Sequence, residues 1–343
     1  MGAFLKKKTG VYYIINSVLI AVLFFVLLIL INSKQIKFYN VGIIINVCIN
    51  IILAVSLNLV TGILGQLVLG HAGFALVGAY ATSLFTLNSG LPLSIAFPIG
   101  LVLAGLFAAV CGLVIGIPAL RLRGDYLAIL TLGFGEIIRV VANNLKITNG
   151  AMGLSGMEAL STRKNPGPMF VYAFLIAVFV IIIMFTFGRS RHGRAVISIR
   201  EDEIASESMG INTTYYKLFA FVLAAFIAGV AGGLYAHHIQ MVDPSRFDFN
   251  RSVEILIMVV LGGMGSITGS VIAATVLTVL PEWLRDFSQY RMLVYSIILI
   301  CVMLFKPSGL LGRYEISIPK IFHCMINKIS GLIKSKHGKT GEV

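Results

Sequence analysis

The chain has 343 residues, of which 58% are hydrophobic and only 12% charged, and its mean hydropathy is +0.94. No soluble fold could bury that much apolar surface, so the composition excludes a soluble protein of two or three domains and predicts an all-α polytopic membrane protein. The net charge of +13 does not indicate nucleic-acid binding, because the basic residues lie in loops and tails between apolar runs, where they orient the chain in the bilayer.

Apolar runs long enough to cross a bilayer follow one another along the chain. The first comes after three lysines, but its length of about 20 residues and the lack of a small-residue cleavage site after it predict a retained helix rather than a signal peptide. Two shorter apolar pieces between 252 and 281 are separated by glycines and form either two short spans or a re-entrant hairpin. We expect about ten transmembrane helices, this pair and eight clear spans at 11–31, 41–60, 67–87, 92–118, 124–142, 169–187, 217–239 and 291–305.

The distribution of basic residues predicts the orientation of the chain. With the N-terminus in the cytoplasm, 17 of the 27 Lys and Arg residues fall inside and 9 outside. This bias predicts an N-in/C-in topology. The expected organisation is a basic cytoplasmic N-terminus (1–10), a transmembrane domain (11–305) with a cytoplasmic loop at 188–216, and a basic cytoplasmic C-terminal tail (306–343).

Two segments interrupt their own apolar runs with glycine, at 61–80 and at 261–270. They fall in the first and second halves of the chain, which is typical of transporters built from two repeats with discontinuous helices near the membrane midplane. Close packing of helices through small residues is the alternative explanation.

The loop at 188–217 carries the clearest local signal. The acidic cluster after Arg200, the small residues that follow it and Gly210 predict a short helix that is capped near Asp202 and ends at Gly210. A short helix lying across a cytoplasmic loop is suited to docking into a groove on a partner protein. A solvated loop that merely joins two spans is the alternative.

Four stretches in this order resemble the LivM-type permease subunit of bacterial branched-chain amino acid ABC importers, over nearly everything from Asn40 to Arg313. They are TGILGQLVLGHAGFALVGAYAT at 61–82, RLRGDYLAILTLGFGEIIRVVANN at 121–144, the loop from Gly188 to Lys217, and AGVAGGLYAHHIQMVDPSRFDFNRSVEILIMVVLGGMGSITGSVIAA at 228–274. The family usually carries Thr-Gly-Gly in the external loop after the fifth span, where this chain has Thr148-Asn149-Gly150. That departure puts a family-specific role for this turn in doubt.

The resemblance implies a permease subunit in the bacterial inner membrane that translocates branched-chain or similar small amino acids. Its expected partners are a second, LivH-type permease subunit, two ATPase subunits that bind ATP and Mg, and a periplasmic or lipid-anchored substrate-binding protein. The segment from Arg200 to Gly210 would be the coupling helix that meets an ATPase. The residues expected to couple are Arg200, Glu201, Asp202, Glu203, Ala205 and Gly210, and those expected to line or shape the path include Gly70, His71, Gly262, Gly263 and Gly265.

Ionisable residues inside a membrane are costly, so each needs a partner or a function. Glu136 and Arg139 stand three apart on one helical face, and we expect a structural ion pair, with a charged contact in the substrate path as the alternative. Arg251 and Glu254 are expected to pair locally. His237 and His238 are expected to face water rather than a metal, because no third ligand lies nearby in sequence.

The chain contains no phosphate-binding loop, nucleophile elbow or zinc-protease motif, so it is expected to be no enzyme, and to hold no metal and no cofactor of its own. Two other functions stay open. One is a urea or short-amide ABC importer permease of the same architecture. The other is an ion-coupled secondary transporter or channel, which would leave the helix after Arg200 without a purpose.

Overall fold

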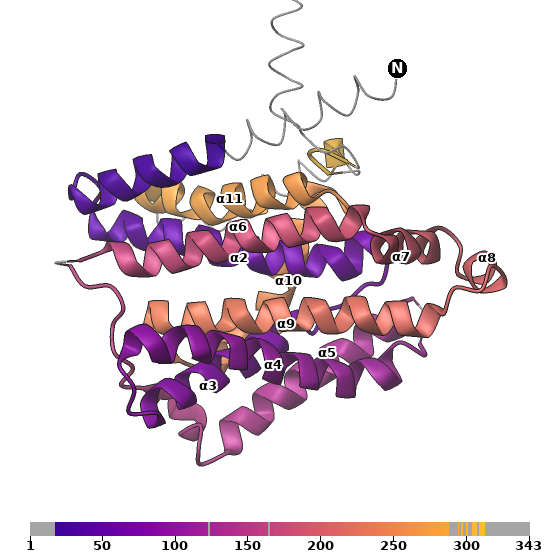
Figure 1. Cartoon of the computed structure of the whole chain (residues 1–343), viewed down its shortest axis with the longest axis horizontal. Coiled ribbons are helices and arrows are strands. Elements are labelled where there is room, and N and C mark those ends of the chain that lie inside the picture. The colour runs from indigo at the N-terminus through magenta and orange to yellow at the C-terminus, as the bar shows by residue number, and fades with distance from the viewer. Residues whose placement is uncertain are drawn as a thin grey trace, which may run out of the picture.

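The computed structural model describes residues 18–287, apart from positions 123 and 164, together with scattered positions between 294 and 312. This part of the chain is helical almost throughout (Figure 1), and the predicted all-α fold is confirmed. Its one sheet is the antiparallel pair of β1 (Leu154–Ser155) and β2 (Met241–Val242). The α-helices are Val18–Asn32, α2 (Phe38–Asn58), α3 (His71–Asn88), α4 (Leu93–Ala119), α5 (Asp125–Asn144), α6 (Gly167–Arg189), α7 (Arg191–Glu201), α8 (Glu203–Ser208), α9 (Thr213–Ile239), α10 (Phe249–Gly262) and α11 (Ile267–Trp283). Shorter turns are the π-helical η1 (Leu59–Ile63) and the 3-10 helices η2 (Gly150–Met152), η3 (Pro244–Phe247) and η4 (Leu284–Phe287).

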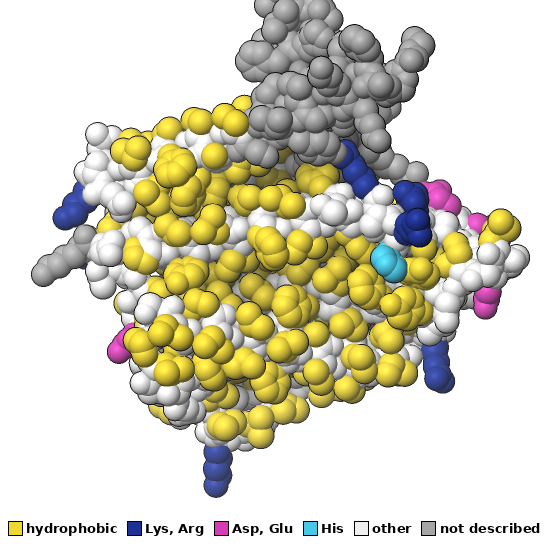
Figure 2. All heavy atoms as spheres, in the orientation of Figure 1, with side chains coloured by type: hydrophobic (Ala, Val, Ile, Leu, Met, Phe, Trp, Pro, Cys, Tyr) yellow, Lys and Arg dark blue, Asp and Glu magenta, His cyan; other side chains and the backbone are white. Residues whose placement is uncertain are grey.

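Four helical segments of the described part are long and apolar enough to cross a membrane: α2 continued by η1, α4, α6 and α9. Val18–Asn32 and α11 are shorter apolar helices. Figure 2 shows apolar side chains across the middle of one face, with charged side chains at its edges. The chain is therefore a multi-pass membrane protein. The N-terminus 1–10, most of the predicted span at 291–305 and the tail from 313 onward lie outside the described residues.

Short polar residues begin the helices that border the loops, as N-caps require. Ser190, Asp202, Asn212, Asp248 and Ser266 each accept a hydrogen bond from the backbone N–H three residues further on. These caps satisfy backbone donors that a helix leaves unpaired at its start. They fix where each loop ends and the next helix begins.

Small residues bring α3, α4 and α9 into close contact, as the glycine content predicts for helices in a membrane. A Cβ atom at Gly78 would overlap the Gly229 backbone, and one at Gly232 would overlap the carbonyl of Ala75. A Cβ at Gly229 would likewise meet the carbonyl of Ala104, which lies on α4. The three helices thus pack backbone to backbone, with α9 at their centre.

Helix α11 runs antiparallel to α2. At one end, the Ser266 carbonyl accepts a hydrogen bond from Asn58 Nδ2 (3.0 Å), and at the other the hydroxyl of Tyr39 donates to Glu282. The predicted interruption between 252 and 281 is confirmed, since α10 ends at Gly262 and α11 begins at Ile267.

Both glycine interruptions lie close to α7, because Arg200 Nη1 donates to the carbonyl of Gly62 (2.9 Å) and lies 3.2 Å from where a Cβ of Gly265 would be. Gly62 and Gly265 therefore lie at the end of the bundle that carries α7 and α8, here called the α8 end, whereas the first interruption ends further inside, where His71 lies beside Ser56 and Ala72 N donates to Ser252 Oγ. The predicted helix at 67–87 is also shorter than expected. The segment from Gly65 to Gly70 is not helical, and α3 starts only at His71.

Candidate functional site

The loop between α6 and α9 folds into two short helices, α7 and α8, which lie beyond the long helices in Figure 1. Asp202 separates them: it ends α7, and its Oδ1 accepts a hydrogen bond from Ala205 N (2.9 Å) to cap α8. Gly210 has a φ of +82° and closes α8 by donating its N–H to the Glu207 carbonyl (2.9 Å). The predicted cap at Asp202 and the predicted end at Gly210 are therefore confirmed. The prediction of a single helix from Arg200 to Gly210 is wrong, since Arg200 and Glu201 belong to α7.

Arg200 points into the bundle. Besides the bond to Gly62, its guanidinium forms an ion pair with Glu201 (2.6 Å), and its side chain is 20% exposed. Its aliphatic part packs against Gly65, where φ is +79° and a side chain would meet Arg200 Cγ. Arg200 therefore ties α7 to the end of η1, which makes it a link within this chain.

Glu203 is also engaged inside the chain. Its carboxylate forms an ion pair with Lys217 Nζ (2.7 Å) on α9, and the Lys217 side chain is only 5% exposed. By contrast, Ile204 is 72% exposed and Met209 is 83% exposed, and Ala205 is also exposed. The outward surface of α8 thus presents Ile204 and Ala205 beside the exposed Glu207, with Met209 just after the helix, while Glu203 ties the helix to α9. The sequence reasoning assigned coupling to those charged residues and missed Ile204, Met209 and Lys217.

A glycine junction, formed by Asn58, Gly62, Gly65, Arg200 and Gly265, joins the two interrupted segments. Asn58 is fully buried, and its amide accepts from Gly265 N (2.8 Å) and donates to the Ser266 carbonyl. A Cβ at Gly62 would overlap Asn58 Oδ1 and the backbone nitrogen of Gly265. Gly265 itself has a φ of +92°, which favours glycine. The junction connects α2, α7 and the α10–α11 turn at one point.

The other two predicted glycines of this turn pack against the chain's own backbone. Gly262 lies against Gly269 at the start of α11, and Gly263, with a φ of +107°, lies against Gly312. The backbone N–H groups of Leu310 and Leu311 donate to carbonyls at the end of α10. These glycines allow close approach of three backbone segments.

His71 and Gly70 lie in the interior. Ser56 Oγ donates to the Leu53 carbonyl and lies within hydrogen-bond distance of His71 Nε2, at 2.8 Å. A Cβ at Gly70 would overlap the carbonyl of Thr131 on α5. Both residues are buried, so in this conformation they shape the packing of α3 rather than line an open path.

The expected pair of Glu136 and Arg139 is confirmed. Arg139 Nε and Nη2 donate to Glu136 Oε2 at 2.8 and 2.7 Å, and the two side chains are 31% and 29% exposed. Glu136 borders a small cavity that Asp248 and Ser252, at the start of α10, also line. The predicted path residues are therefore not gathered in one cavity: this pair lies on α5, His71 in the interior, and the glycines at the α8 end.

Glu136→Gln is expected to cost about 1 kcal/mol of stability or less, because an ion pair that is partly exposed to solvent contributes little and the amide can still accept from Arg139. Transport per folded transporter should change less than about twofold. Thermal unfolding of the purified complex, together with uptake normalised to folded protein, measures both. A tenfold loss of transport at normal abundance would instead assign Glu136 to the substrate path.

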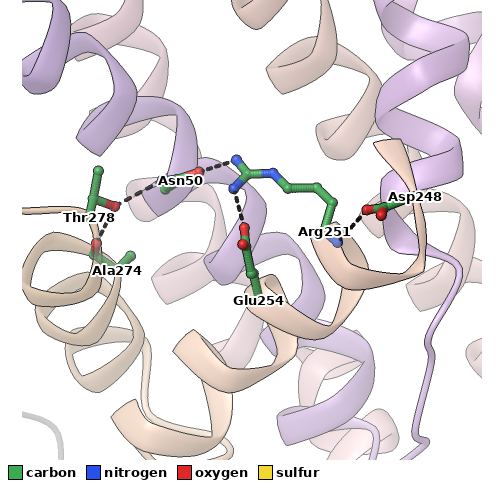
Figure 3. Close-up of polar contacts among 6 residues, drawn as sticks. All are labelled: Asn50, Asp248, Arg251, Glu254, Ala274 and Thr278. Atoms are coloured by element: carbon green, nitrogen blue, oxygen red, sulfur yellow. Dashed lines mark hydrogen bonds and ion pairs between the residues drawn. The ribbon is translucent and has the colours of Figure 1, made fainter. Parts of the chain in front are cut away.

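A second polar network crosses three helices (Figure 3). Arg251 Nη1 donates to Glu254 Oε2 (2.9 Å), which confirms the predicted local pair, and Nη2 donates to Asn50 Oδ1 (2.6 Å) on α2. Asn50 Nδ2 in turn donates to Thr278 Oγ1 (2.8 Å) on α11. The sequence reasoning missed Asn50 and Thr278, although an asparagine inside an apolar run was a signal that could have found the first.

The loop between α9 and α10 uses its charges locally. Asp243 Oδ1 accepts from Ser245 N (2.9 Å), Asp248 caps α10, and Arg246 lies 3.9 Å from the Asp243 carboxylate. The hydrogen bond with Tyr235 raises the pKa of Arg246 above its ordinary value, so this guanidinium stays charged.

At the end of α9, His237 is buried and bonds Thr86 Oγ1 (3.1 Å), so the expectation that it faces water is wrong. Among the described residues, no three His, Cys, Asp or Glu side chains form a group that could hold a metal ion.

Comparisons with known proteins agree on one family. The profile of the family described as "Branched-chain amino acid transport system / permease component" matches residues 39–304. The chain is similar to the high-affinity branched-chain amino acid transport system permease protein LivM of Salmonella typhimurium, with 40% identity over 269 residues that cover 70% of this chain and 62% of that protein. LivM of Escherichia coli K12 is 38% identical over the same length, with the same shares covered.

A weaker similarity extends to the permease protein LivH of Escherichia coli K12, which is 33% identical over 129 residues, covering 37% of this chain and 42% of LivH. The matches to the two LivM proteins span 62% of the length of each. No solved structure gives a significant match.

Proposed function

The chain belongs to the permease family of branched-chain amino acid transport systems, and we propose that it is the permease subunit of an ATP-driven importer of branched-chain amino acids. The similarity to two LivM proteins covers 70% of the chain and supports this substrate class. We place the subunit in a bacterial inner membrane, with about ten transmembrane helices and both termini in the cytoplasm.

The observation that carries the ATP-driven role is the outward surface of α8. Ile204, on a six-residue helix that Asp202 and Gly210 fix at both ends, and Met209, directly after that helix, expose large apolar side chains. Exposed apolar residues on a rigid, protruding element are typical of a docking surface. We assign this surface to an ATPase subunit, which would bind ATP and Mg, since this chain has no phosphate-binding motif.

The contacts of Arg200 support a route by which motion of the ATPase reaches the membrane. The proposed docking helix follows α7 directly, and Arg200 ties α7 to the glycine junction, which joins α2 to the α10–α11 turn. Closure of two ATPase subunits on ATP would move α8 and α7 and shift both interrupted segments, as alternating access requires. A second, LivH-type permease subunit would complete the path, and a periplasmic or lipid-anchored binding protein would deliver the substrate.

The contacts at the α8 end support the proposed topology. Gly62, Arg200, Gly265 and Leu310 lie at this one end, and Tyr39 and Glu282 meet at the other. In an N-in/C-in chain of ten spans, the four residues at the α8 end belong to cytoplasmic turns. Tyr39 and Glu282 belong to external turns. The pair α10–α11 returns to the side it left, whether or not it crosses fully.

Ile204→Glu tests the docking surface. The substitution should lower co-purification of the ATPase subunits about tenfold or more, because it places a charge in an apolar contact, while the fold is unaffected at a site that is 72% exposed. The measurement is the ATPase content of the purified permease, with Ser208→Glu on the same helix as a control for added charge. Normal co-purification and normal ATP-dependent uptake of Ile204→Glu would show that α8 is not the docking helix.

A further inference from the structure

Arg251 and Glu254 form an ion pair at mid-depth in the helical bundle. Their anchor, Asn50, lies 12 residues after the start and 13 before the end of the apolar segment Phe38–Ile63. Arg251 is 23% exposed and Glu254 is 53% exposed. A carboxylate at this depth and this exposed is costly unless it faces water or a polar partner, so its surroundings in the assembled transporter cannot be lipid.

Arg251 is held in a defined position. Asn50 is 6% exposed and uses both ends of its amide, one toward Arg251 and one toward Thr278, whose hydroxyl donates to the Ala274 carbonyl (Figure 3). The backbone nitrogen of Arg251 also donates to the Asp248 carboxylate, which caps α10. The guanidinium is therefore oriented by α2 and α11, in addition to its own helix.

The pair leaves binding capacity unused. Arg251 has five N–H donors on its guanidinium, and its contacts within the described part of the chain use one hydrogen on Nη1 and one on Nη2. On Glu254 those contacts use Oε2, so Oε1 can still accept. A cation and an anion, 2.9 Å apart and both accessible, therefore offer donors and acceptors side by side.

We propose that Arg251 and Glu254 form a transient binding site for the charged end of a free α-amino acid: Arg251 binds the α-carboxylate and Glu254 binds the α-ammonium group. This inference rests on the proposed function, because it concerns what passes through the permease. An α-amino acid zwitterion carries one positive and one negative group on the same α-carbon. These two groups match the pair, and binding adds no net charge to the site. Apolar neighbours on α10, such as Ile257, are suited to the side chain of a branched-chain substrate.

The Glu136–Arg139 pair is the matched comparison. It has the same i, i+3 spacing, the same residue types and a Glu–Arg distance of 2.7 Å. No described residue of another helix hydrogen-bonds its guanidinium, whereas Arg251 is fixed by Asn50. Its carboxylate is also less exposed, at 31% against 53%. We therefore assign the site to the α10 pair and a structural role to the α5 pair.

Glu254→Gln in the complete transporter tests the assignment, because the amide can still accept from Arg251 but no longer attracts an ammonium group. We expect leucine imported per ATP hydrolysed to fall about tenfold to a hundredfold, as loss of one charge-assisted hydrogen bond implies. The thermal unfolding midpoint and the subunit composition should be unchanged. The ATPase activity stimulated by loaded binding protein should stay within about twofold of that of the unsubstituted transporter. Glu254→Asp should recover most of the import, and Glu136→Gln should lose less than about twofold.

Three outcomes would overturn the site. Normal import by Glu254→Gln would show that the charge is not used, an equal loss in Glu136→Gln would show that the effect is not specific to this pair, and loss of the second permease subunit from Glu254→Gln would make the pair an interface contact. Failure of the proposed function is distinguishable from all three, because the unsubstituted transporter would then show no ATP-dependent import of leucine.

Discussion

Arg200→Ala is expected to lower ATP-driven uptake about tenfold or more while the ATPase subunits still co-purify. The substitution removes the bond to the Gly62 carbonyl and the side chain that packs against Gly65. A hydrogen bond from a charged group contributes about 1.5–3 kcal/mol, which corresponds to a tenfold to hundredfold effect on an equilibrium that depends on it. The docking surface of α8 is unchanged, so ATP hydrolysis should continue without productive transport.

The measurement for Arg200 is the number of substrate molecules imported per ATP hydrolysed in proteoliposomes. Arg194→Ala is the control, because Arg194 lies on the same helix, is exposed and bonds only the nearby Arg189 carbonyl among the described residues. Arg200→Lys should be intermediate, since it keeps the charge but not the planar group. An unchanged ratio of import to hydrolysis in Arg200→Ala would show that coupling does not pass through the glycine junction.

Gly62→Ala is expected to lower the free energy of unfolding of the permease by about 1–3 kcal/mol, the range that overpacking of a well-packed core gives. The added Cβ would overlap Asn58 Oδ1 and the Gly265 backbone nitrogen, which are the two ends of a partly buried hydrogen bond. Neither can yield easily, because Asn58 is fully buried and Gly265 belongs to the backbone of the turn. Loss of this contact separates α2 from the α10–α11 turn.

The thermal unfolding midpoint and the amount of folded protein in the membrane measure the effect of Gly62→Ala. Gly133→Ala is the matched control, because Gly133 is also helical and a Cβ there meets no described atom within 4 Å. It should be neutral or slightly stabilising, as alanine favours helix. Equal midpoints for the two variants would contradict the tight packing at the junction.

Local features of the fold were predictable from the sequence. Apolar runs of spanning length gave most of the long helices, since hydropathy and backbone satisfaction in lipid leave few alternatives. Asp202 and Gly210 marked the ends of α8 because capping depends on residues within a few positions. The i, i+3 pairs of Glu136 with Arg139 and of Arg251 with Glu254 followed from helix geometry alone.

Contacts between distant segments were not predictable. Arg200 reaches Gly62 across 138 positions and Arg251 reaches Asn50 across 201, and no periodicity encodes such distances. The family resemblance implied that Arg200 and Glu203 couple to an ATPase, but it could not show that they also hold α7 and α8 to the bundle through Gly62 and Lys217. The break between helices was visible as glycines, but its depth depends on the non-helical segment from Gly65 to Gly70, which the apolar run concealed.

The central claim is that this chain moves branched-chain amino acids only as part of an ATP-driven assembly. The most direct test is uptake of radiolabelled leucine by proteoliposomes that contain this chain, its partner permease and the ATPase subunits, supplied with loaded binding protein outside and ATP inside. We predict uptake that requires ATP hydrolysis and stops when the ATPase subunits are omitted. Uptake of equal rate without those subunits would contradict the account and identify the chain as a secondary transporter or channel.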